Sequence, residues 1–116
     1  MKFKLIVAMV QDEKTDAVVD MAREHGATGC TVITSARGEG LKPAKTFLGL
    51  TVEGLRDVVL FLVEEHMSRD ILESIGKAGR FDEEPGTGVA FVVDIEDAIG
   101  LTSQIKTLEK EIGDEL

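Results

Sequence analysis

Two short glycine-rich segments hold the residues of this sequence that are best suited to chemistry. One is Arg37-Gly38-Glu39-Gly40, and the other is Glu84-Pro85-Gly86-Thr87-Gly88. Glycine lets backbone amide groups approach an anion closely, while an arginine or a threonine hydroxyl adds a further donor. Each segment alone is more often a plain turn. Together they predict an anion-binding site that contains Arg37, Gly38, Gly40, Gly86, Thr87 and Gly88.

The other reactive side chains show no catalytic pattern. The only histidines are His25 and His66, and Cys30 is the only cysteine, too few for a closed zinc site within one chain. We expect both histidines in solvent and Cys30 buried as a small apolar residue. The acidic residues at 82–84 are expected to be solvated, although one of them could hold a Mg²⁺ ion that accompanies a nucleotide. We therefore predict a protein that is not an enzyme and requires no cofactor.

Length and charge narrow the class of protein further. The 116 residues suffice for one domain, residues 1–116, and the net charge of −9 disfavours a nucleic-acid partner. No run of eighteen apolar residues exists, and a single cysteine fits a reducing compartment, so we expect a cytoplasmic location. Residues 36–56 have a net charge of +2, whereas the rest of the chain carries −11. A long loop that alone is basic is a candidate for binding an anion, although it could equally be solvated without a specific role.

Two strand–helix–strand units are predicted to position these segments. The first has strands at 2–10 and 30–35 around a helix capped by Asp12 and ended by Gly26. The second has strands at 58–63 and 89–93 around a helix capped by Ser68, with Gly79 near its end. Apolar residues at helical spacing form the expected buried stripes, which are Ala17, Val18, Met21 and Ala22, then Ile71, Leu72, Ile75 and Ala78.

Two such units predict an α+β fold of the ferredoxin-like βαββαβ type. Its four-stranded antiparallel sheet has both helices on one face. The other face is left bare with apolar positions, so we expect the chain to assemble with copies of itself. A long loop at 36–56 joins the two units, and a C-terminal helix is predicted at about 103–113. In a trimer of such units, the end of the second strand and the start of the fourth can meet across a subunit boundary.

The ordered set of motifs resembles the PII signal-transduction superfamily up to about Leu101. The stretch from Gly26 to Val32 is similar to the family's glycine-rich entry into the second strand, with Thr31 as its threonine. The Arg37 segment resembles the start of the family's long T-loop, and Gly86-Thr87-Gly88 is similar to the family's B-loop. Glu96-Asp97-Ala98-Ile99 resembles the stretch that precedes the C-terminal segment.

This resemblance implies a homotrimer that binds an adenine nucleotide in clefts between subunits. A partner protein, for which a membrane transporter is one candidate, would be controlled through the mobile T-loop. Carried over, Thr31, Gly38, Gly40, Gly86, Thr87 and Gly88 line the cleft, with Arg37 at the base of the loop. The family's phosphate-binding cations correspond here to Val89, Gly100 and Thr102, so ADP, AMP or another small anion is favoured over ATP. The T-loop has no tyrosine, which excludes uridylylation on tyrosine.

Two alternatives remain open on the sequence. One is a metal-tolerance trimer like the CutA family, which shares this architecture, and the other is a small ferredoxin-like enzyme. Sparse histidine and cysteine disfavour the first, and the absence of a recognisable acid/base set disfavours the second. The site prediction also implies that Gly88→Val abolishes ligand binding and leaves the trimer intact, because the new side chain would fill space that a phosphate needs.

Overall fold

The computed structural model describes residues 1–36, 46–47, 50–51 and 56–101 of the chain. Within these residues, no helix is both long and apolar enough to cross a membrane. The helices and strands, in chain order, are β1 (Phe3–Gln11), the 3₁₀ turn η1 (Asp12–Lys14), α1 (Thr15–Glu24), β2 (Cys30–Ala36), β3 (Thr46–Phe47), β4 (Leu50–Thr51), β5 (Arg56–Glu64), the 3₁₀ turn η2 (Glu65–Met67), α2 (Ser68–Gly79) and β6 (Gly88–Asp94).

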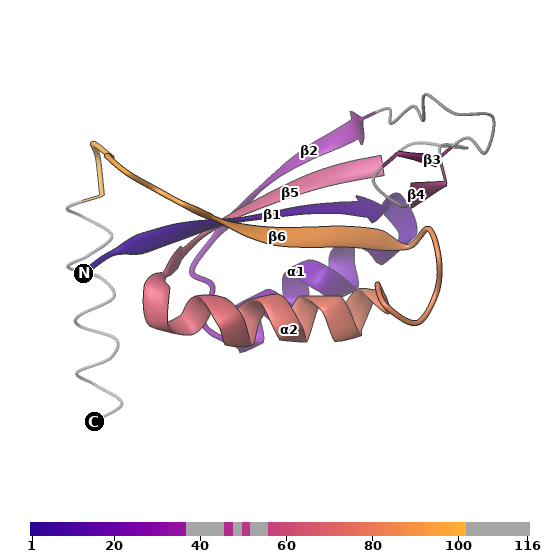
Figure 1. Cartoon of the computed structure of the whole chain (residues 1–116), viewed down its shortest axis with the longest axis horizontal. Coiled ribbons are helices and arrows are strands. Elements are labelled where there is room, and N and C mark those ends of the chain that lie inside the picture. Colours follow the sequence, from indigo (N-terminus) through magenta and orange to yellow (C-terminus); the bar gives the residue numbers. More distant parts are fainter. Residues whose placement is uncertain (37–45, 48–49, 52–55, 102–116) are drawn as a thin grey trace.

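Four of the strands form one antiparallel sheet in the order β2-β5-β1-β6. Val7 lies at its centre, opposite Leu60 of β5 on one side and Phe91 of β6 on the other. Both helices lie on one face of this sheet (Figure 1). The predicted ferredoxin-like fold is therefore confirmed. Within the predicted loop at 36–56, β3 and β4 pair as a short ladder. The rest of residues 37–55 and the predicted C-terminal helix lie outside the described residues.

The core lies between the helices and the sheet face that they cover. Alternate residues of β1 and β5 reach this face, because side chains of a strand point to opposite sides in turn. The contributing residues are Ile6, Ala8 and Val10 of β1, Val59, Phe61 and Val63 of β5, and Val18, Ala22, Ile71 and Ile75 of the helices. Full burial of one such aliphatic side chain stabilises the fold by about 1.5–3 kcal/mol. In the predicted stripe of α1, Ala17 is exposed, and Thr15 is buried in addition to Val18 and Ala22.

Both predicted helix caps are wrong, because a 3₁₀ turn directly precedes each helix. Asp12 begins η1, where no side chain caps the turn. Ser68 is the first residue of α2, and its hydroxyl donates to the carbonyl of Glu65 at 2.8 Å instead of accepting a backbone N–H. The side chain that does cap a turn is Glu64, whose carboxylate accepts from the backbone N–H of His66 at 2.9 Å.

The face of the sheet opposite the helices is apolar and partly exposed. We call it the bare face, and it consists of Leu5, Val7, Met9, Thr31, Ile33, Val58, Leu60, Leu62, Val89, Phe91 and Val93. Ile33, Phe91 and Val93 are 49%, 38% and 41% exposed. A contiguous apolar surface of this kind marks an interaction site, so the sequence-based expectation of a bare apolar face is met.

Cys30 is exposed, which corrects the expectation that it is buried. It begins β2, an edge strand of the sheet whose residues are nearly all exposed. The β-branched sequence of this strand predicts its extended conformation, but residue types alone do not distinguish an edge strand from a central one.

Candidate functional site

Both predicted glycine segments adjoin the same end of the sheet. Here β2 ends at Ala36 and β1 ends at Gln11, while β5 begins at Arg56 and β6 begins at Gly88. The pairing register aligns them, because Arg56 lies opposite both Ala36 and Gln11, and Gly88 lies opposite Val10. We call this the loop end. The β3–β4 pair and the turn between α2 and β6 are both at this end in Figure 1.

The two segments nevertheless adjoin opposite edges of the sheet. Strands β2 and β6 are the outer strands, and three spacings of about 4.8 Å separate them, so their ends lie about 14 Å apart. One phosphate group is too small to contact both strand ends, Ala36 and Gly88, in a single chain. The segment that follows Ala36 lies outside the described residues.

Thr31 is the predicted site residue on β2. It is exposed on the bare face opposite Leu60, five residues before Ala36, a separation of about 17 Å along an extended strand. A bulge interrupts the pairing between Ile33 and Ala36, where Ser35 has a φ of 60°. Such a bulge bends the strand just before the basic loop. The other predicted residues near this strand, Arg37, Gly38 and Gly40, lie outside the described residues.

The turn at 84–88 is held together by its own threonine. Thr87 is only 4% exposed, and its hydroxyl lies 2.9 Å from the carbonyl of Glu84 and 3.1 Å from that of Arg80. Its carbonyl accepts from the N–H of Gln11 at 3.0 Å, which ties the turn to β1. Gly86 is buried with a φ of 81°, a conformation that favours glycine. The Thr87 hydroxyl thus stabilises the turn, a role that its position in a Gly-Thr-Gly motif did not indicate.

Gly88 packs against the ring of Phe81. A Cβ atom added at Gly88 would lie 2.3 Å from Cε1 of this ring, and one added at Gly79 would lie 2.1 Å from the same atom. The ring thus occupies the space beside both glycines. This corrects the reason given for the Gly88→Val variant, because the added side chain meets Phe81 and not an empty space for a phosphate.

A buried polar contact at the loop end was missed by the sequence reasoning. Thr15 and Asp57 are 6% and 8% exposed, and the Thr15 hydroxyl donates to a carboxylate oxygen of Asp57 at 2.7 Å. Arg56, the neighbour of Asp57, is also buried. The available signal was the alternation of strand side chains, since extending the apolar run at 58–63 by one residue puts Asp57 on the same face as Val59. The contact joins the start of α1 to the start of β5, where the basic loop ends.

Replacing Thr15 with valine should destabilise the fold by about 1–3 kcal/mol, because a buried carboxylate loses its hydroxyl donor while the volume of the side chain is kept. Urea unfolding at one fixed protein concentration measures this loss. Thr15→Ser retains the donor and serves as the matched control. Equal unfolding free energies for the valine and serine variants would show that the hydrogen bond contributes nothing.

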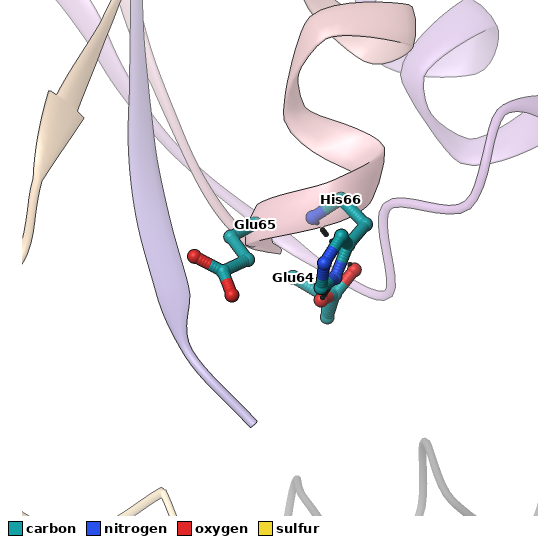
Figure 2. A group of neighbouring side chains, drawn as sticks. All are labelled: Glu64, Glu65 and His66. Carbon is teal, nitrogen blue, oxygen red and sulfur yellow. Dashed lines mark hydrogen bonds and ion pairs between the residues drawn. The ribbon is translucent and has the colours of Figure 1, made fainter.

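A second group of polar side chains lies at the other end of β5. His66 Nδ1 is 2.5 Å from one carboxylate oxygen of Glu64, and the backbone N–H of His66 donates to the other oxygen (Figure 2). The hydrogen bond with Glu64, followed by the negative charges of Glu64 and Glu65, raises the pKa of His66 above 6.5. The histidine side chain itself is 82% exposed.

The raised pKa of His66 predicts a pH-dependent contribution to stability. The stabilisation from protonated His66 is fully present below its unfolded-state pKa of 6.5. It is lost as the pH rises through the higher pKa of the folded state. The difference in unfolding free energy between the parent and His66→Gln should therefore shrink from pH 6 towards pH 8. Chemical denaturation across this range measures it, and a difference that stays constant or grows with pH would contradict the assignment.

The sheet order and the two helices on one face define a small ferredoxin-like α+β domain. A family model described as "Nitrogen regulatory protein P-II" matches residues 3–104. The chain therefore belongs to the P-II family of regulatory signal-transduction proteins. Members of this family are generally not enzymes, typically form trimers, and bind effectors and partner proteins.

A solved structure supports the same fold. The apo form of CPII from Thiomonas intermedia K12, described as a nitrogen regulatory PII-like protein, is 17% identical and superimposes with a TM-score of 0.62. The similarity covers 82% of this chain and 90% of that one. No curated protein matches this sequence.

Proposed function

We propose that this chain is an effector sensor that binds an adenine nucleotide or a small anion between subunits of a homotrimer. One observation supports this most strongly: the two glycine segments adjoin the same end of the sheet but opposite edges. A neighbouring copy can therefore supply the half of the site that one chain lacks. The site residues proposed are Thr31, Arg37, Gly38, Gly40, Gly86, Thr87 and Gly88, of which Thr87 would act by holding the turn in place, because its hydroxyl is engaged within the turn.

The bare face supplies a reason for assembly. Its large side chains include Phe91, Ile33 and Val93, each more than a third exposed in the isolated chain. Burial of such a surface against other copies removes it from water, which is favourable at roughly 25 cal/mol per Å² of apolar area. A trimer built on this face also brings subunit edges together, as the shared site requires.

The charge distribution favours an anionic effector with few phosphates. The basic loop has a net charge of +2 in a chain of net charge −9, so attraction of an anion is local to the loop end. The position after the turn at 84–88 is Val89, a half-buried residue opposite Met9, where the family pattern has a lysine. One fewer cation weakens binding of a triphosphate more than that of ADP or AMP, with or without Mg²⁺.

Occupancy of this site would change the conformation of the basic loop and so control a partner protein. The loop exit is anchored by the buried Asp57–Thr15 contact, which gives the loop a fixed point at its β5 end. A membrane transporter is a candidate partner, whereas the net charge of −9 disfavours nucleic acid. The cytoplasmic location remains a prediction.

Isothermal titration calorimetry with ATP, ADP, AMP and bicarbonate tests the proposal. We expect saturable binding of ADP or AMP with one site per chain. Arg37→Gln should weaken this binding about tenfold or more, because a charge-assisted hydrogen bond contributes roughly 1.5–3 kcal/mol. Lys42→Gln removes the same charge from the same loop outside the glycine motif and is the matched control. No binding of any adenine nucleotide, or equal affinities of the two variants, would overturn the proposed site.

A further inference from the structure

The polar group at the end of β5 contains three residues whose side chains can bind metals. Glu64, Glu65 and His66 each offer one ligand atom, and these atoms lie within 4.8 Å of one another. They lie at the end of the sheet opposite the loop end, because β5 begins at Arg56 and ends at Glu64. Eight residue steps of an extended strand span about 27 Å, so this group is separate from the proposed effector site.

Glu64 distinguishes this group from a set of exposed acidic side chains, because it is largely buried. Its side chain is only 10% exposed, and within the part of the chain that the structure describes its carboxylate hydrogen-bonds to His66 alone, through Nδ1 and the backbone N–H. Among the described residues, no lysine or arginine forms an ion pair with it. A buried carboxylate is costly unless a positive charge compensates it. Protonated His66 supplies that charge, and a metal ion bound to the neutral imidazole would supply it in its place.

The backbone presents these side chains in a fixed arrangement. Glu64 is the last residue of β5 with extended backbone angles, φ −68° and ψ 142°, and the chain then turns directly into η2. The His66 N–H donates to the Glu64 carboxylate at 2.9 Å, and this hydrogen bond fixes the turn. Two of the three ligand groups are thus held side by side before any ion binds (Figure 2).

We propose that Glu64, Glu65 and His66 bind a divalent transition-metal ion of the Zn²⁺ type. An imidazole with two carboxylates suits zinc and its neighbours, whereas Mg²⁺ and Ca²⁺ prefer oxygen ligands alone. Zinc–ligand bonds of about 2.0–2.2 Å place ligand atoms roughly 3.4 Å apart in a tetrahedral site. The Glu65 side chain extends away from the Glu64–His66 pair in Figure 2, so it must rotate towards them to close the site, and water completes the coordination.

The chain has only two histidines and one cysteine, so zinc binding can be assigned to a site with few variants. Zn²⁺ binding is measured by calorimetry on the full chain in a Cys30→Ser background, which removes the exposed thiol. His25→Gln is the matched control for His66→Gln. His25 also pairs with a carboxylate, that of Asp70 at 2.8 Å, but the described residues place no third ligand group beside that pair.

We expect one Zn²⁺ per chain in the background protein and in His25→Gln, and at least tenfold weaker binding in His66→Gln and Glu64→Gln. Imidazole NMR signals of the unmutated chain provide a readout that does not depend on variant folding, because zinc should shift the signals of His66 and not those of His25. The absence of saturable zinc binding would overturn the proposal. So would binding that survives His66→Gln unchanged, or zinc-induced shifts confined to His25.

Discussion

Gly88→Ala should destabilise this protein by about 1–3 kcal/mol, and shortening Phe81 should recover part of that loss. The added methyl group would lie 2.3 Å from Cε1 of Phe81, a distance that real Cβ atoms do not adopt. Inserting even one carbon into a packed site forces neighbouring side chains from their preferred rotamers. Gly88→Val should cost more, since it adds three carbons at the same place. Urea unfolding of each variant at equal protein concentration measures these losses.

A double-mutant cycle separates this collision from a general effect of replacing glycine. Phe81→Leu alone loses packing, but combined with Gly88→Ala it should cost less than the sum of the two single changes. Gly76→Ala is the control, because nothing lies within 4 Å of its added Cβ and an alanine in the middle of α2 should stabilise the helix by up to about 1 kcal/mol. Additive losses in the cycle would show that the Phe81 ring does not limit residue 88.

Leu60→Glu should convert the assembled protein into folded monomers. Leu60 lies near the centre of the bare face, between Val7 of β1 and Thr31 of β2. In an isolated chain the new carboxylate can remain solvated, whereas in a trimer three copies would be buried without partners at a cost of several kcal/mol each. Size-exclusion chromatography with light scattering should show the mass fall from that of a trimer to that of one chain.

Ala17→Glu provides the control for this experiment. It introduces the same charge at an exposed position of α1, on the helix side of the sheet, so the variant should assemble as the parent does. Circular dichroism should show the same secondary structure in both variants. A Leu60→Glu protein that keeps the parent mass would mean that the bare face is not the interface.

The strands and helices could be predicted from the sequence because their signals are local. Val58 to Val63 is a continuous apolar run, and β1 alternates between two faces, of which the structure buries the one with Ile6 and Ala8 under the helices. The helix caps were mispredicted because Asp12 and Ser68 have the residue types of caps, but Asp12 lies within a 3₁₀ turn and Ser68 directly follows one, and composition does not reveal these turns. The family followed from an ordered set of weak motifs, and this inference is confirmed over residues 3–104.

The contacts of the candidate site were harder to predict because they join residues far apart in the chain. Thr15 and Asp57 are 42 residues apart, and no periodic pattern pairs a helix threonine with a strand aspartate. The packing of the Phe81 ring beside Gly79 and Gly88 depends likewise on the direction of that side chain, which the spacing of residues in the sequence does not predict. The ligand roles of Thr31, Arg37, Gly38 and Gly40 remain predictions from the family resemblance.

The placement of β2 and β6 at opposite edges of the sheet has a consequence for how such a sensor behaves on dilution. Each separated subunit would hold two incomplete half-sites, so effector capture and self-association become linked equilibria. A bound effector would then tighten the oligomer, and lowering the protein concentration would weaken the apparent affinity even though no residue had changed. The sensor would thus report its own abundance together with that of its ligand.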